Sequence, residues 1–239
     1  MIIRPPLFVA LAAMIGAQSS PLSLSGQEPI PPLPDAVMPG SVVFSEIMWM
    51  GSEGSSADEW VELRNLAPYP VDLEGWTITR LDGEQHRVMI RIPAGRIAAG
   101  GTYLIANYGP GESRSHLAVE PDLVSTAVAL PNSQLQLALY DGAPDQGGEL
   151  IDVADDGKGL PLAGATSPKA AMVRSGPMVD GRLSQAWSTA TEAAGWKAGS
   201  TELGTPGGLP ATAAGAMGES ATAVAPSAWA WVKAGRPPP

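Results

Sequence analysis

Hydrophobic and polar side chains alternate in short runs along the middle of the chain. In residues 59–65 (EWVELRN), Trp60 and Glu62 fall on one face of an extended strand. Val61 and Leu63 fall on the other face. Similar runs, separated by Gly, Pro or Asp-Gly turn signals, lie at residues 41–49, 71–81, 87–92, 102–107, 135–140 and 149–153. The pattern predicts an all-β fold, either a sandwich or a barrel.

The flanks of this β-patterned region have a different character. Residues 20–40 hold six prolines and no periodicity, which is typical of an extended linker. Residues 208–239 are rich in Ala, Gly and Pro, and we expect a disordered tail there. The predicted sandwich therefore occupies residues 41–207. Within it, a few residues around 184–194 are expected to form a short helix.

The first residues have the pattern of a secretory signal peptide. Arg4 supplies a positive charge, and residues 7–17 form an apolar run. That run is shorter than the roughly 20 residues that a membrane-spanning helix needs. Ala17-Gln18-Ser19 provides small residues at a cleavage site, so residues 1–19 are expected to be removed. We expect a secreted or extracytoplasmic protein with no integral membrane segment in the mature chain.

The charge and the cysteine content exclude several classes of partner and of site. Acidic residues outnumber basic ones by 24 to 14, which gives a formal net charge of −10. An acidic surface repels phosphate backbones, so nucleic acid is not an expected partner. The chain has no cysteine, which excludes disulfides, thiolate metal sites and a cysteine nucleophile.

Five short motifs carry a resemblance to a known family. They are SEIMWMGS (45–52), DEWVELRN (58–65), DLEGWTI (72–78), AMVR (171–174) and GTPG (204–207). With these motifs the chain resembles lamin-tail domains of the kind found in bacterial exported proteins. The resemblance implies an immunoglobulin-like β-sandwich that is not an enzyme and that contacts a protein or a polymer of the cell envelope. Val173 departs from the glutamate usual at that place in bacterial members.

Three residues of these motifs are expected to serve the fold. Trp60 and Trp76 supply large apolar surfaces, and tryptophans in a sandwich usually anchor the core with the indole N–H satisfied. Gly75, directly before Trp76, suits a tight approach or a positive φ where a strand begins.

Glu46 and Glu62 fall within predicted strands and have two interpretations. A buried carboxylate needs a partner, so a structural role requires backbone N–H groups or a pairing with Arg64 or Arg174. Alternatively, the two glutamates lie on neighbouring strands and form the paired carboxylates of a secreted hydrolase, which would also need a cleft. We favour the structural role, and we expect no enzyme activity and no cofactor.

Residues 48–57 (MWMGSEGSSA) join the first two predicted strands and form the candidate binding loop. Trp49 and Met50 beside Gly and Ser are typical of adaptable binding surfaces, unless Trp49 packs into the core instead. Exposed tryptophans would also suit a carbohydrate-binding or surface-polymer-binding module. Trp229 and Trp231 in the tail either dock on the body or have no role.

Metal binding has one candidate site. Calcium takes oxygen ligands, and Asp152, Asp155 and Asp156 (DVADD) are the candidate ligands, although the EF-hand spacing is absent. His86 and His116 share no motif and are expected to be single surface histidines. Solvated acidic loops are the competing interpretation of the aspartates.

Overall fold

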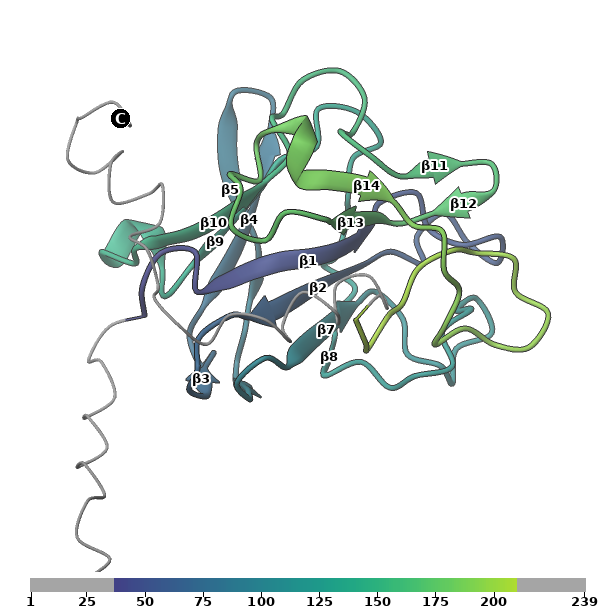
Figure 1. The fold of residues 1–239 in the computed structure, drawn as a ribbon, viewed down its shortest axis with the longest axis horizontal. Coiled ribbons are helices and arrows are strands. Elements are labelled where there is room, and N and C mark those ends of the chain that lie inside the picture. Colours follow the sequence, from purple (N-terminus) through teal and green to yellow (C-terminus); the bar gives the residue numbers. More distant parts are fainter. Residues whose placement is uncertain (1–36, 210–239) are drawn as a thin grey trace, which may run out of the picture. The chain divides into compact units, whose positions relative to one another are not determined.

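Two sheets of mainly antiparallel strands pack face to face in a computed structural model, which describes residues 37–209 (Figure 1). The six-stranded sheet has the order β14-β13-β1-β2-β7-β8 and the four-stranded sheet the order β10-β9-β4-β5. This confirms the prediction of an all-β, immunoglobulin-like sandwich. The strands of the first sheet are β1 (Val42–Met48), β2 (Trp60–Asn65), β7 (Thr102–Ala106), β8 (Leu123–Val124), β13 (Met172–Arg174) and β14 (Trp187–Thr189).

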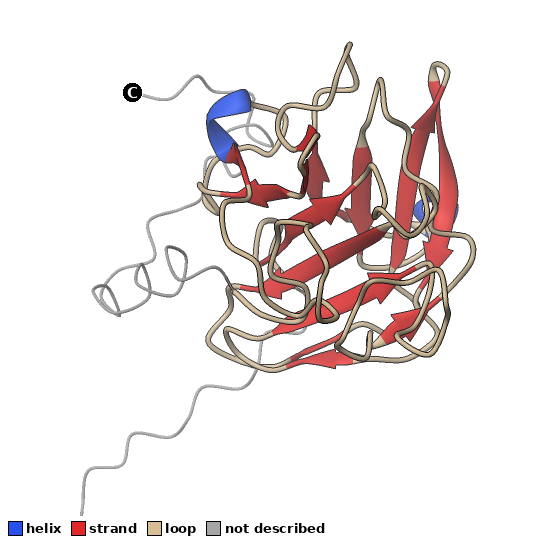
Figure 2. Ribbon diagram, turned by 90° about the vertical axis from the view of Figure 1, so that its right-hand side faces the viewer, coloured by secondary structure: helices blue, strands red, loops and turns tan. Residues whose placement is uncertain are grey.

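The second sheet and the smaller elements complete the body. Its strands are β4 (Thr77–Asp82), β5 (Gln85–Arg91), β9 (Leu137–Tyr140) and β10 (Leu150–Ala154). Two small ladders pair β3 (Val71–Asp72) with β6 (Arg96–Ile97) and β11 (Ala165–Thr166) with β12 (Lys169–Ala170). In the described part, helical structure is confined to two 3₁₀ turns, η1 (Pro144–Gln146) and η2 (Ser184–Ala186) (Figure 2).

The core lies between the sheets and follows the period-two pattern of the strands. Phe44 pairs with Leu63 and Ile47 with Val61 across β1 and β2, and all four side chains are buried. Ile78 on β4 is fully buried as well. Burying such side chains stabilises a fold by about 1.5–3 kcal/mol each.

The outer face of β1 and β2 is also buried, because the C-terminal part of the domain crosses it. The indole of Trp196 packs on Trp60 with ring centroids 6.0 Å apart. Residues 203–207, which we call the strap, continue across the same face. The Leu203 N–H donates to the Lys169 carbonyl, and the Ala171 N–H donates to the Leu203 carbonyl, which fixes the start of the strap beside β12 and β13.

One side of the sandwich is closed by contacts between the sheets. The Gly40 N–H donates to the Ile151 carbonyl at 2.8 Å, and the Phe44 N–H donates to the Asp152 carboxylate at 2.9 Å. Both strands are irregular there, since β1 shifts register after Phe44 and β10 shifts before Asp152. The β10 edge of the second sheet is therefore covered by the beginning of β1.

One sequence prediction needs correction, and another is located more closely by the structure. Residues 71–81 are not one strand: β3 ends at Asp72 and β4 starts at Thr77. Gly75 lies between them with φ +81°, and its N–H donates to the Ile92 carbonyl, so the chain turns there. The short helix expected from a few residues around 184–194 is the 3₁₀ turn η2, and it ends there because residues 187–189 pair with β13 as β14.

No helix within residues 37–209 is long and apolar enough to cross a membrane. The predicted signal peptide, most of the linker and the tail with Trp229 and Trp231 lie outside the described residues.

Candidate functional site

Glu46 and Glu62 are direct cross-strand neighbours on the outer face of the six-stranded sheet. Both are buried, with 1% and 0% of their surface exposed. The expected backbone N–H donors are confirmed, whereas the alternative partners Arg64 and Arg174 do not hydrogen-bond to either glutamate. The donors come from the bulge of β1 and from the strap.

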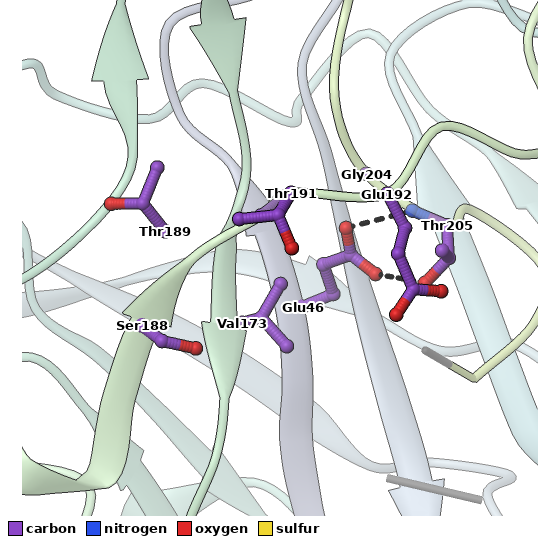
Figure 3. A pocket seen from close by; sticks show the side chains of 9 residues that line it. Glu46, Val173, Ser188, Thr189, Thr191, Glu192, Gly204 and Thr205 are labelled. Atoms are coloured by element: carbon purple, nitrogen blue, oxygen red, sulfur yellow. Dashed lines mark hydrogen bonds between the residues drawn. The ribbon is translucent and has the colours of Figure 1, made fainter. Parts of the chain in front are cut away.

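The strap supplies three of the four hydrogen bonds to this carboxylate pair. Thr205 donates its N–H to Glu46 Oε1 at 2.9 Å and its hydroxyl to Glu46 Oε2 at 2.7 Å (Figure 3). The Gly207 N–H donates to Glu62 Oε2 at 2.8 Å. Ser45, the bulge residue, donates its hydroxyl to Glu62 Oε1 at 3.0 Å. Every carboxylate oxygen of the pair thus has a donor.

Burial shapes the acidity of the pair. Desolvation raises the pKa of Glu46 from 4.5 to about 7, against the lowering effect of the Thr205 hydrogen bonds, and the charge of Glu192 raises it further. Desolvation also raises the pKa of Glu62 well above its usual range, and the nearby charges of Glu46 and Asp122 add to that effect. The two acids therefore ionise only at pH values well above those of ordinary glutamates.

The space beside Glu46 is too small for a substrate. The cavity there has a volume of about 40 Å³ and is lined by β13, β14 and the strap, with Glu192 at its rim (Figure 3). A space of this size holds no more than a few water molecules. Glu46 and Glu62 consequently do not form the open pair of carboxylates that the hydrolase alternative requires.

Arg174 serves the closed side of the sandwich rather than the carboxylate pair. Its guanidinium donates to both Asp152 carboxylate oxygens at 3.3 Å, and both side chains are buried. It also donates to the Val179 carbonyl at 2.7 Å and stacks on Trp187 at 4.9 Å. Desolvation nevertheless raises the pKa of Asp152 to about 6, although Arg174 lowers it.

The calcium candidates are not brought together. Asp152 faces Arg174, while the Asp155 carboxylate accepts the N–H groups of Gly157 and Leu162. Asp156 accepts from a neighbouring backbone N–H in its own turn. Asp155 and Asp156 thus accept backbone N–H groups of a turn, and Asp152 belongs to an ion pair. No cluster of three or more metal-ligating side chains occurs among residues 37–209.

The predicted binding residues of the first loop are buried, which corrects that expectation. Trp49 is 5% exposed, and its indole N–H donates to the Ala163 carbonyl at 2.9 Å. Met50 is 3% exposed, and its carbonyl accepts from the Lys169 ammonium. The loop packs its large side chains inward because the segment that carries β11 and β12 lies over it.

The other tryptophans also belong to the scaffold. Trp60 and Trp76 are buried as expected; Trp187 is also buried and donates its indole N–H to the Gly181 carbonyl at 2.7 Å. The Trp60 indole N–H has no hydrogen-bond partner, contrary to expectation. Trp196 is half-buried against Trp60. No row of exposed tryptophans is present among residues 37–209, so the polymer-binding alternative loses its basis there.

Sequence reasoning missed Glu202, which joins three segments. Its carboxylate accepts from the Glu53 N–H at 2.7 Å and contacts His116 Nδ1 at 2.8 Å. His116 is therefore not a single surface histidine. His86 is exposed, and its ring contacts Thr79 Oγ1 and Gln136 Oε1. No local pattern marks Glu202, because its partners are 86 and 149 residues away in sequence.

A shallow groove of about 320 Å³ lies between the end of the first loop, β4 and residues 129–131. Its polar groups include Glu59 and Arg80. The Glu59 carboxylate accepts the Leu130 N–H at 3.0 Å, and the Arg80 guanidinium donates to the Ala129 carbonyl at 2.7 Å. Desolvation raises the pKa of Glu59 to about 7. Both groups hold the 129–131 segment against the sandwich.

The β5 strand is the long open edge of the described body. It has seven residues and pairs with β4 alone. The opposite edge of its sheet, β10, is covered by the start of β1, and the edges of the other sheet, β8 and β14, have two and three residues. An open edge presents unpaired N–H and C=O groups to another chain.

Comparison with known families supports the resemblance seen in the motifs. The family model described as Lamin Tail Domain matches residues 37–157. No protein with a curated description matches the chain. The strands β13 and β14 and the strap lie beyond the matched residues, yet they complete the six-stranded sheet and cover the carboxylate pair.

Proposed function

Because the chain belongs to the lamin tail domain family, an immunoglobulin-like family that is not typically enzymatic, we propose that it is an exported interaction module that binds a protein of the cell envelope or its surroundings. The open β5 edge is the observation that carries the binding role. The motifs of residues 1–19 support export.

The arrangement of the polar residues favours binding over catalysis. The acid pair is buried under the strap, and Asp152 is held by Arg174. Glu46, Glu62 and Asp152 thus connect segments of the chain that are distant in sequence. A sandwich held in this way is a rigid scaffold that presents its edge strand in a fixed geometry.

Affinity capture with cross-linking tests the binding role. The chain from Ser20 onward is immobilised and exposed to envelope and extracellular fractions of its source, and cross-linked residues are mapped by mass spectrometry. We expect one or a few proteins to be retained through reproducible cross-links to the body. Retention equal to that of an unrelated immunoglobulin-like sandwich, used as the control, would contradict the proposal.

Export is tested separately. The full chain and a variant in which residues 7–17 carry three added lysines are expressed in the source organism, and the mature N-terminus is sequenced. We expect the full chain outside the cytoplasm with Ser20 as its first residue and the variant retained inside. An uncleaved chain in the cytoplasm would refute export.

A further inference from the structure

The turn between β4 and β5 fixes which backbone groups of β5 point outward. Asp82 and Gln85 pair across a two-residue turn in which Gly83 has φ +65°. In such a hairpin the residues that flank the turn exchange hydrogen bonds, and hydrogen-bonded and non-hydrogen-bonded pairs then alternate. His86 and Val88 therefore belong to non-hydrogen-bonded pairs.

The N–H and C=O groups of His86 and Val88 accordingly face away from β4. The neighbouring strand agrees with this assignment, because Leu81, the partner of His86, donates its N–H to Gln136 on the other side. No other segment of residues 37–209 pairs with β5. Two N–H groups and two C=O groups thus face outward, where the backbone of an added strand can pair with them. We call these four groups the ladder.

The side chains of β5 show what kind of strand fits this ladder. The strand (QHRVMIR) carries Arg87, Arg91 and His86 and no acidic residue, in a chain with a net charge of −10. Val88 is 56% exposed and offers an apolar contact on the face of the sheet opposite Arg87. Arg87 already forms an exposed ion pair with Asp82 at 2.9 Å. Its guanidinium is therefore oriented so that it can donate to a carboxylate near this edge.

A second copy of β5 is a poor occupant of the same ladder. Antiparallel pairing of β5 with itself about Arg87 would set the two copies of Arg87 directly opposite each other, and like charges directly opposite destabilise a sheet. Carboxylates on the added strand would instead form favourable cross-strand pairs. Charges beyond about 8–10 Å are largely screened at physiological salt, so the charges near β5 are Arg87 and Arg91 together with Asp82 and Glu84 of the adjoining turn, and the rest of the acidic surface contributes little.

We propose that β5 binds an extended, acidic segment of a partner protein, which pairs with the outward backbone groups of His86 and Val88 as an added strand. This inference rests on the proposed binding role and gives it a place and a partner chemistry. The sequence of the partner segment should alternate acidic and β-branched residues, because alternate side chains of an added strand face opposite sides.

Two labelled peptides test the proposal by fluorescence anisotropy with the full chain. One is Thr-Glu-Val-Glu-Val-Glu-Thr with blocked ends, and the other has lysine at each glutamate position. We expect the acidic peptide to bind and the basic peptide to bind at least about tenfold more weakly, with the difference reduced at high salt. Equal binding of the two peptides would overturn the acidic assignment.

A matched pair of variants locates the site. Val88→Pro removes the outward N–H without touching the β4 ladder, since proline is tolerated where an edge-strand N–H faces solvent. Val88→Thr keeps that N–H and serves as the control. We expect about tenfold weaker peptide binding for Val88→Pro and little change for Val88→Thr, with urea unfolding verifying that both variants fold.

The outcomes separate this inference from the proposed function. Peptide binding that is insensitive to Val88→Pro, or no binding of either peptide, would overturn the β5 assignment. A dimer of the chain that is lost in Val88→Pro would make a second copy the occupant and would likewise overturn it. Retained envelope proteins with cross-links elsewhere on the body would leave the general binding role standing.

Discussion

Replacing Glu46 by glutamine should make the stability of the sandwich less dependent on pH. The folded-state pKa of Glu46 is about 7 instead of 4.5, chiefly because burial desolvates the carboxylate. The unfolded chain therefore loses this proton at lower pH than the folded chain does. As pH rises from 4.5 to 7, the unfolded state gains relative to the folded state, and the free energy of unfolding falls.

The size of this change in stability follows from the shift in the pKa of Glu46. One pKa unit corresponds to about 1.36 kcal/mol, so the wild-type domain loses roughly 3 kcal/mol through Glu46 between acidic pH and pH 8. Glutamine keeps an acceptor for the Thr205 N–H and stays neutral throughout. Glu46→Gln should match the wild type near pH 4.5 and exceed its stability by up to about 3 kcal/mol at pH 8.

Urea unfolding followed by tryptophan fluorescence at several pH values between 4.5 and 8 measures this difference. Comparing variant with wild type cancels the contributions of Glu59 and Asp152, whose pKa values are also raised, whereas the pKa of Glu62 falls in the variant because the charge of Glu46 is gone. Glu84→Gln, on the exposed hairpin turn, is the matched control and should follow the wild-type profile. A stability difference for Glu46→Gln that is constant with pH, or that favours the wild type at pH 8, would refute the reasoning.

Three further changes test other parts of the scaffold. Arg174→Met leaves the Asp152 carboxylate buried without its cation and should lower the free energy of unfolding in urea by about 3–5 kcal/mol, part of which Asp152→Asn in the same chain should restore. Gly204→Ala places a Cβ 2.6 Å from a Glu46 oxygen at φ +148°, so it should cost about 2 kcal/mol and speed amide exchange in the strap; unchanged exchange would count against the strap contacts. Trp49→Phe loses one buried hydrogen bond and should lower thermal stability by about 1 kcal/mol without altering peptide binding to β5.

The strands were largely predictable because each has a local pattern. Residues 59–65 contain β2, and the predicted faces are confirmed by the register, which sets Val61 and Leu63 toward the core. The same pattern did not reveal that Trp60 and Glu62 are equally buried. Their cover is the Trp196 side chain and the strap, which lie more than 130 residues later in sequence.

The polar contacts were less predictable than the strands. Asp152 looked like part of an acidic loop, yet a register shift in β10 turns it toward Arg174 and the Phe44 N–H. The expected backbone donors to Glu46 and Glu62 are present, but the sequence did not show that they belong to Thr205 and Gly207, nor that hydroxyl groups replace arginine as the other donors. Such pairings depend on bulges and long loops, which sequence periodicity does not encode.

The strap also determines when the chain can finish folding. Glu46 and Thr205 are 159 residues apart, and β1 lies next to β13, so the centre of the first sheet joins segments made early and late in synthesis. Contacts of such high sequence separation form slowly, because loop closure must precede them. A nascent chain that has reached only residue 157 lacks both β13 and the cover over its buried acids. Closure of the sandwich therefore has to wait until β13 and the strap have been synthesised.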